Sequence, residues 1–374
     1  MKLFQTQEIG SLAKPNWRVK KIQNNALAEH DYQDIRKWSE ILGINSAALA
    51  ELLKKELTPE SRKRITEFSS LFAIKLCEKA GLDIVFSGEQ FRTEMYQEAI
   101  ENINGFVFHG HTRSFDSKYY KKAAVVSPPA LKKNYHLEEF LFTKNNASKP
   151  IKLPLTGAYT LADWSFNEFY TRKFSASSDP KEARYRAKSA FALDLAKNVM
   201  QPLFKGLIDA GCSFIQVDEP AAATHANEIP ILAESFNESV KGLDCKFSMH
   251  ICFSDYRRLF PHILEMKKCS QFALEFANRD DERRKGYASL ELFNEYNDNR
   301  EIGLGVIDVH NNFIEPRELV RDRILYAARI LDPERIFVNP DCGLRTRSWD
   351  IAFSKLRNMA EGAGLARMSY EGKL

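Results

Sequence analysis

Two side chains with metal-binding chemistry stand close together in the second half of the 374-residue sequence. His250 and Cys252 are two residues apart within a β-rich run at 247–253, and this spacing points both side chains to the same face of an extended strand. An imidazole beside a thiolate favours zinc. A His-x-Cys pair arises often by chance, so the prediction of a zinc site requires further ligands.

Two further ligand candidates follow later β-rich runs: Glu275 in ALEFAN and Cys342 in VNPDCG. With His250 and Cys252 they would give zinc two thiolates and one carboxylate. A thiolate-rich zinc is a poor Lewis acid for making hydroxide from water, which disfavours hydrolysis, and it suits a soft sulfur ligand. We therefore predict that zinc binds a substrate thiol and lowers its pKa, so that the thiolate forms at neutral pH.

The other cysteines show no such context. Cys77, Cys212, Cys245 and Cys269 are scattered through helical or early-strand segments, where a cysteine usually acts as a small buried apolar residue. The Cys-x2-Cys knuckles that are typical of closed structural zinc sites are absent from the sequence. The scatter favours free thiols in a reducing compartment.

Ligands so far apart in sequence need a frame that brings them together. From residue 84 onward, short β-rich runs alternate with stretches of helical spacing, a pattern typical of parallel strands joined by crossover helices. The predicted strands cover residues 83–87, 152–156, 213–217, 246–252, 271–276, 303–309 and 336–339, and a first strand near 8–12 completes the set. The sequence therefore predicts an α/β fold, a single (β/α)8 TIM barrel spanning residues 1–374.

Polar residues follow nearly every predicted strand. They are Ser11, Glu89, Asp218, Glu219, His250, Cys252, Glu275, His310, Asp341 and Cys342. Barrel active sites lie at the carboxyl ends of the strands. Helix N-caps could explain a few terminal Ser or Asp residues, but N-caps do not favour His, Cys or Glu.

Two regions fall outside the strand–helix alternation. Residues 12–80 have helical spacing, and residues 104–150 form an insertion with an extended pair at 105–111 and 120–126 and a return near 141–149. The insertion could cover the barrel mouth or be an edge hairpin without a function. Its basic and aromatic run, Lys118, Tyr119, Tyr120, Lys121 and Lys122, could dock an acidic carrier protein or be a solvated face.

The composition is that of a soluble globular protein. Hydrophobic residues make up 44% and charged residues 28% of the chain. The net charge of +4 is too small to indicate a nucleic-acid partner. Because no apolar run approaches the length of a membrane span and no signal peptide is recognisable, we expect a cytoplasmic location.

Seven motifs occur in an order that matches a known family. They are IGS at 9–11, SGEQFRTEM at 87–95, TGAYTLADWS at 156–165, IQVDEPA at 215–221, MHIC at 249–252, GVIDVH at 305–310 and VNPDCGLRTR at 338–347. Together they resemble the C-terminal catalytic barrel of cobalamin-independent methionine synthases, in its short single-barrel form. The resemblance implies zinc-dependent methyl transfer to the thiol of L-homocysteine, which forms methionine.

The resemblance also implies a role for each motif residue. Zinc would be held by His250, Cys252, Glu275 and Cys342. The homocysteine amino group would meet Glu89 and Asp218, and its carboxylate would meet Ile9, Gly10 and Ser11. His310 would relay a proton to the leaving group of the donor, although a strand-end histidine that only bonds a neighbour would look the same. Trp164 would pack against the pterin of a folate, although a core tryptophan would also fit.

The methyl donor stays open. Long members of the family carry a second barrel that helps to hold the tail of 5-methyltetrahydrofolate, whereas short relatives are associated with methylcobalamin or a corrinoid carrier protein. Ala158 and Tyr159 stand where folate users commonly have Pro and Val. Both donors are therefore retained as predictions.

Other functions remain as alternatives. A methyltransferase of the same superfamily could act on another thiol such as coenzyme M, but a sulfonate thiol has no ammonium to recruit Glu89 and Asp218. A non-catalytic zinc or corrinoid-protein binding module is the second alternative. The metal-free decarboxylase branch is disfavoured by the complete set of zinc ligands.

Overall fold

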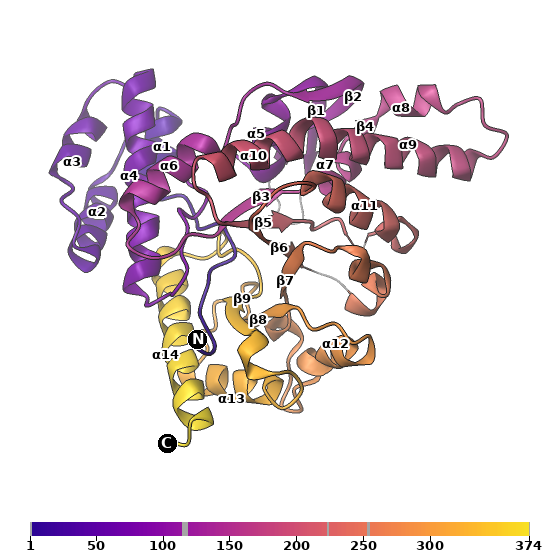
Figure 1. The fold of residues 1–374 in the computed structure, drawn as a ribbon. Coiled ribbons are helices and arrows are strands. Elements are labelled where there is room, and N and C mark those ends of the chain that lie inside the picture. Colours follow the sequence, from indigo (N-terminus) through magenta and orange to yellow (C-terminus); the bar gives the residue numbers. More distant parts are fainter. Residues whose placement is uncertain (1, 114–118, 223, 253–254, 374) are drawn as a thin grey trace.

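A six-stranded parallel sheet forms the centre of the computed structural model, which describes residues 2–113, 119–222, 224–252 and 255–373. Its order is β3-β5-β6-β7-β8-β9 (Figure 1). The strands are β3 (Leu153–Thr156), β5 (Phe214–Asp218), β6 (Lys246–Ile251), β7 (Cys269–Leu274), β8 (Glu301–Ile307) and β9 (Ile336–Pro340). All five pairings are parallel, so the carboxyl ends of the six strands lie at one mouth.

Two short extended segments close this sheet into a barrel. Thr6 forms a parallel bridge with Val338 of β9, Gln7 bridges Ile84, and Val85 bridges Ile151 beside β3. The six strands and the two bridged segments together form the eight-stranded wall of a (β/α)8 barrel. The predicted fold is therefore confirmed.

The first strand of the barrel differs from the sequence prediction in its position. Pairing occurs at Thr6 and Gln7, before the predicted segment at 8–12, and within that segment only Leu12 is bridged, to Leu344, among the described residues. Gly10 instead packs against the side chain of Glu89, where an added Cβ would lie 2.7 Å from Glu89 Oε1. Residues 8–11 therefore form part of the barrel mouth and not of its wall.

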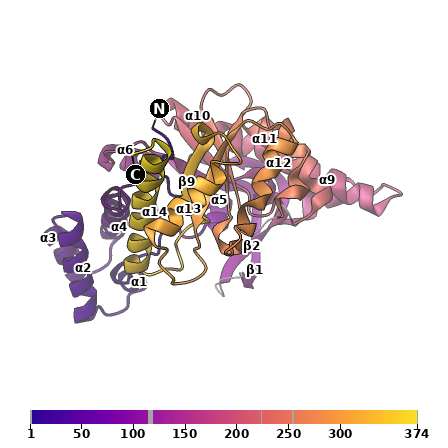
Figure 2. The same cartoon turned by 90° about the horizontal axis from the view of Figure 1, so that it is seen from below.

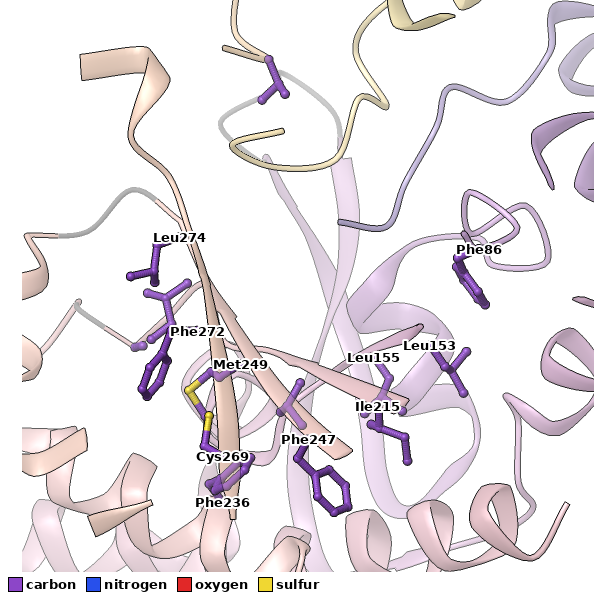
Figure 3. Close-up of a cluster of buried hydrophobic side chains, with 14 of the residues drawn as sticks. Phe86, Leu153, Leu155, Ile215, Phe236, Phe247, Met249, Cys269, Phe272 and Leu274 are labelled. Atoms are coloured by element: carbon purple, nitrogen blue, oxygen red, sulfur yellow. The ribbon is translucent and has the colours of Figure 1, made fainter. Parts of the chain in front are cut away.

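Side chains alternate between the two faces of the barrel wall. Ile215, Phe247 and Phe272 belong to the apolar cluster outside the strands (Figure 3), and Phe236 of α11 (Ile229–Ser239) packs against Phe247 with ring centroids 6.4 Å apart. The intervening residues Gln216, Ser248 and Gln271 must then face the barrel interior. The interior is therefore unusually polar, since barrel interiors are mostly filled by branched aliphatic residues.

Residues 12–80 are helical, as predicted. Their helices are α1 (Asn16–Ile22), α2 (Glu29–Leu42), α3 (Ala47–Lys54) and α4 (Pro59–Lys79). Thr58 caps α4 by accepting a hydrogen bond from Ser61 N, and Pro59 occupies the first helical position. In Figures 1 and 2 this group of helices lies on one side of the barrel, opposite α8 and α9.

The remaining α-helices are α5 (Met95–Glu101), α6 (Leu137–Asn146), α7 (Ala158–Asp163), α8 (Glu168–Lys173), α9 (Pro180–Leu195), α10 (Gln201–Asp209), α12 (Glu291–Glu295), α13 (Arg317–Ala327) and α14 (Trp349–Tyr370), with a π-helical turn at Ala196–Met200 between α9 and α10. Short 3-10 turns occupy Ala226–Glu228, Tyr256–Leu259, His262–Glu265, Ala277–Arg279, Lys285–Leu290 and Pro333–Arg335. Among the described helices, none combines the length and apolar character needed to cross a membrane.

The inserted region contains the predicted hairpin. Strand β1 (Ile103–Arg113) pairs antiparallel with β2 (Tyr119–Leu131), and β4 (Phe166–Asn167) adds a short third strand. The expected return near 141–149 is instead mostly helix α6. Glu138 and Glu139 in its first turn favour a helix start, and Phe140 and Thr143 form its buried face.

Candidate active site

Three of the four predicted metal ligands lie together at the barrel mouth. His250 is on β6, Cys252 directly follows β6, and Cys342 follows β9. Their candidate ligand atoms lie within 4.8 Å of one another. The strand order explains this convergence, because β6 and β9 end at the same mouth.

The His250 ring is oriented for metal binding. Its Nδ1 lies 2.9 Å from the carbonyl oxygen of Ala273 on β7, so Nδ1 donates its proton there and Nε2 is the ring nitrogen left to bind a metal. Nε2 is buried and has no hydrogen-bonding partner among the described residues. A buried ring nitrogen without a partner is costly unless a ligand completes it, and a backbone bond to the other nitrogen is typical of metal-binding histidines.

The two thiols interact with each other. The Cys252 thiol donates a hydrogen bond to the Cys342 sulfur, which lowers the pKa of Cys342 well below its ordinary value and raises that of Cys252. His250 further favours the Cys342 thiolate. Two sulfurs and one imidazole nitrogen form a donor set that fits zinc.

Glu275 is not part of the group of ligand atoms within 4.8 Å. Its Oε1 instead accepts hydrogen bonds from Asn278 Nδ2 at 2.6 Å and His310 Nε2 at 2.7 Å. The hydrogen bond to Glu275 raises the pKa of His310. The predicted proton-relay histidine and the predicted fourth zinc ligand are therefore direct neighbours.

Asp341 supports the loop between these ligands. Its carboxylate accepts hydrogen bonds from the backbone N–H groups of Phe276, Ala277 and Asn278 at 2.7–2.9 Å. Asp341 precedes Cys342, and Phe276 follows Glu275. One buried carboxylate thus fixes the position of two ligand segments.

The residues predicted to hold an amino acid surround the inner edge of the mouth. The Asp218 side chain and the backbone of Ile9 are joined by Gln216, whose Nε2 donates to Asp218 Oδ1 and to Ile9 O, both at 2.7 Å. Gly10 packs against Glu89, and a Cβ on Gly343 would lie 2.3 Å from Ser11 Oγ. The segment at 9–11 therefore contacts both predicted ammonium-binding elements and the turn that carries Cys342.

An open cavity of about 340 Å3 adjoins this segment. Its lining includes Ser11, Glu89, Arg92 and Arg345. Glu89 has a φ of 55°, a left-handed conformation that non-glycine residues rarely adopt and that often marks functional sites. A residue with a strained backbone, Glu89, thus lines the open cavity.

Trp164 lies in an aromatic group at the C-terminal end of α7. Its ring centroid is 6.4 Å from that of Tyr96 and 6.1 Å from that of Tyr120. Tyr120 belongs to β2, so the inserted hairpin contributes directly to this group. The sequence did not single out this contact, because it depends on how the insertion folds back over the barrel.

Glu219 has a structural role that its strand-end position conceals. Its carboxylate accepts hydrogen bonds from Thr160 N, Thr160 Oγ1 and Tyr159 N at the start of α7. Tyr159, one of the two positions that depart from the folate users, is fully buried and donates from its hydroxyl to Glu228. Glu219 therefore fixes the helix that carries Trp164.

The basic and aromatic run of the insertion is only partly described. Lys118 lies outside the described residues. Tyr119 is 69% exposed, the ammonium of Lys121 lies 5.4 Å from the Phe108 ring centroid, and that of Lys122 lies 4.6 Å from the Phe166 ring centroid. These lysines pack on aromatic rings, an arrangement that suits either a solvated face or a docking face.

Comparison with known proteins identifies the family. A model of the cobalamin-independent synthase catalytic domain matches residues 45–365. The chain belongs to the cobalamin-independent methionine synthase family. It is therefore an enzyme of the methyltransferase class, as the sequence predicted.

Individual relatives extend the likeness over the whole chain. The methionine synthase of Thermoplasma acidophilum is 36% identical over 374 residues, with 95% of each chain covered. That of Pyrococcus horikoshii is 34% identical, covering 99% of this chain and 94% of its own. A B12-independent methionine synthase from Shewanella sp. W3-18-1, solved in complex with selenomethionine, shares the fold with a TM-score of 0.77 at 22% identity, covering 99% of both chains.

Proposed function

We propose that this methyltransferase methylates the thiol of L-homocysteine at a zinc ion held by His250, Cys252 and Cys342, with Glu275 as the fourth ligand. The observation that carries the proposal is the convergence of the three donor atoms within 4.8 Å, with His250 Nε2 buried and lacking a hydrogen-bonding partner. The curated relatives, which are methionine synthases, support the same reaction.

Zinc in a thiolate-rich site would lower the pKa of the substrate thiol, so that a nucleophilic sulfur is available at neutral pH. The residues of the chain then orient the substrate. Glu89 and Asp218 offer two carboxylates to the substrate ammonium, and the segment Ile9, Gly10 and Ser11 offers N–H and hydroxyl donors to its carboxylate. This arrangement favours an amino-acid thiol over the sulfonate thiol coenzyme M.

Glu275 and His310 would act as a pair. The hydrogen bond between them keeps a proton on His310 Nε2, because the neighbouring carboxylate favours the charged imidazole. A protonated His310 at the mouth could deliver this proton to the leaving nitrogen of a methylfolate. A corrinoid leaving group takes up the bonding electrons at cobalt and needs no proton, so His310 matters less for that donor.

The proposed donor is methylcobalamin, a corrinoid carrier protein or 5-methyltetrahydrofolate. The aromatic group of Trp164, Tyr96 and Tyr120 supports a planar donor, because aromatic rings stack on flat conjugated groups. The hairpin surface around Tyr119, Lys121 and Lys122 could dock an acidic corrinoid carrier.

The test is methionine formation, measured by mass spectrometry on zinc-loaded protein with L-homocysteine. Methylcobalamin and 5-methyltetrahydrofolate are supplied in parallel, and coenzyme M replaces homocysteine in a third arm. Methionine in either of the first two reactions supports the proposal and assigns the donor. Methylation of coenzyme M alone would overturn it. If homocysteine binds at the metal but no methionine forms, a carrier-bound donor is required.

A further inference from the structure

Tyr256 is a buried tyrosine that the proposed reaction leaves without a role. It begins the 3-10 turn Tyr256–Leu259, four residues after the predicted ligand Cys252, and is only 3% exposed. Its hydroxyl oxygen lies 3.1 Å from the carbonyl oxygen of Ile251 and 3.1 Å from that of Glu275, and it accepts a hydrogen bond from Glu275 N at 2.7 Å. One hydroxyl group therefore contacts the end of β6 and the residue that follows β7.

The hydroxyl takes the place of a backbone hydrogen bond of the sheet. The last residue pair of β6 and β7 is Ile251 with Leu274, and the next bond of a parallel ladder would run from Glu275 N–H to Ile251 O. Glu275 N–H donates instead to Tyr256 Oη, which shares its own proton between the two carbonyl oxygens. The inserted oxygen thus separates the two strand ends and still satisfies their buried backbone groups.

This separation matters because both strand ends carry predicted metal ligands. His250 and Cys252 flank Ile251 in the sequence, and Glu275 is the residue whose N–H the hydroxyl holds. The distance between the two ligand-bearing segments is therefore set by a side-chain oxygen and not by direct backbone pairing.

Asp341 holds the segment after β7 from its other side. Its carboxylate accepts hydrogen bonds from the N–H groups of residues 276–278, so Tyr256 and Asp341 together hold four successive N–H groups. Asp341 directly precedes Cys342. The two buried side chains therefore connect, in series, the three segments that carry the predicted ligands.

A second tyrosine offers a close comparison. The ring of Tyr256 packs edge-on against the Phe276 ring, with centroids 5.7 Å apart, and the ring of Tyr287 stacks on the same phenyl group at 5.5 Å. Tyr287 is also buried, but its hydroxyl donates to Gly305 O on β8. The two tyrosines thus share a packing partner and differ in what their hydroxyl groups hold.

We propose that Tyr256 is a positioning residue of the metal site, whose hydroxyl sets the spacing between Glu275 and the ligand pair on β6. Without this oxygen, Glu275 N–H and Ile251 O either approach each other or lose their partner, and both outcomes displace Glu275 relative to Cys252. Because its hydroxyl bonds to backbone groups, Tyr256 acts through the ligand residues and not as a ligand. This inference rests on the proposed zinc site, and its test separates the two.

The test compares Tyr256→Phe with the matched control Tyr287→Phe in the full-length protein. Zinc affinity is measured by competition with a chromophoric chelator. Tyr256→Phe should weaken zinc binding about 10- to 100-fold, as expected when a group that orients metal ligands is removed. It should also shift the absorption bands of the cobalt(II)-substituted protein, which report ligand geometry. Tyr287→Phe should match the unmodified protein in both measurements.

A further measurement uses the unmodified protein and does not depend on the folding of a variant. In the zinc-free protein, the backbone amide of Glu275 should exchange with deuterium as slowly as the amides of β6, because the Tyr256 hydroxyl holds it whether or not a metal is bound. Rapid exchange of this amide without zinc would overturn the proposal.

The outcomes for the two proposals are distinct. If Tyr256→Phe keeps the zinc affinity of the unmodified protein, or if both variants weaken zinc binding equally, the positioning role is wrong and the zinc site stands. If the unmodified protein binds no zinc, the proposed site fails, and the role of Tyr256 fails with it.

Discussion

Cys252 and Cys342 carry the strongest single-residue prediction. Each side chain supplies one of the three convergent donor atoms, so Cys252→Ala or Cys342→Ala should abolish zinc retention and methyl transfer. The barrel should stay folded, because the apolar core lies around the strands and not at the mouth. Zinc content by mass spectrometry and far-ultraviolet circular dichroism check both parts.

Cys245→Ala is the matched control for these variants. Cys245 is partly buried, and its thiol bonds to the backbone carbonyl groups of Cys212 and Lys246, at the end of β6 opposite to the donor group. It should retain full zinc. Loss of zinc from this control, or global unfolding of the mouth variants, would contradict the proposed site.

Gln216 should position the substrate without touching the metal. Its amide holds both Ile9 O and Asp218 Oδ1 at 2.7 Å. Gln216→Met keeps the side-chain length but removes both donors, which costs about 1–3 kcal/mol. We expect the KM for homocysteine to rise about tenfold, with kcat and zinc content nearly unchanged. Steady-state kinetics test this, and an equal fall in kcat would contradict a positioning role.

The residues predicted from the sequence differ in how directly local spacing defines them. His250 and Cys252 could be predicted from the sequence, because the alternation of side chains along one strand points both of them in the same direction. Gln216 could not, because its partners are Ile9, in the mouth segment that follows the first barrel strand, and Asp218, at the end of its own strand, and the contact with Ile9 depends on the closed barrel. Glu219 looked like an active-site acid, yet it caps α7.

At the scale of elements, helix α6 is joined to the barrel by a buried charged group. Glu139 accepts a hydrogen bond from Arg92 Nε at 2.8 Å and lies 3.3 Å from His136 Nδ1. Burial and the charge of Arg92 lower the pKa of His136 to about 4, despite the opposing effect of Glu139. His136 is therefore neutral in the folded protein near pH 6, where the unfolded chain would bind a proton.

This difference predicts a pH-dependent contribution to stability. Because the folded-state pKa of His136 lies below its ordinary value of 6.5, the unfolded chain binds the extra proton, and stability falls as the pH drops from about 6.5 toward 4. Between pH 7 and pH 5 the loss is about 2 kcal/mol. His136→Asn should remove it, which urea unfolding at both pH values would show.

His30→Asn provides the control, since the side chain of His30 is 63% exposed. It should leave the pH dependence as in the unmodified protein. Glu139 titrates in a different pH range. Burial raises its pKa, but Arg92 and His136 outweigh this effect and lower the pKa to about 2. The stability that depends on its charge is therefore lost mainly below pH 4.5.

The order of elements was more predictable than their exact limits. Parallel strands and crossover helices follow from the alternation of β-rich and helical runs, and the six main strands lie where expected. The first barrel strand was misplaced because the apolar pattern continues through Ile9 and Leu12, whereas the pairing that closes the barrel lies at Thr6 and Gln7, and Leu12 only bridges Leu344 at the mouth. Tertiary contact with Glu89, not local propensity, determines that limit.

At the scale of the whole molecule, the barrel should not depend on zinc for folding. The core runs continuously from the N-terminal helices through the strands to α14. A chelator should therefore remove zinc and activity but leave the melting temperature within a few degrees. Differential scanning calorimetry before and after chelation tests this expectation, and cooperative unfolding on chelation would instead favour a purely structural metal.

The barrel wall is not equally strong around its circumference. The barrel segments at residues 6–7 and 84–85, here called the weak segments, are joined to their neighbours by single bridges. Strands β6 and β9 instead pair along their length. Glu8, Ile9 and Glu89 follow the weak segments, and the thiols of Cys252 and Cys342 follow β6 and β9. The backbone amides of the weak segments should exchange with deuterium before those of β6. The side of the mouth that carries the residues predicted to bind the amino acid should therefore open locally more often than the side that carries the thiolates.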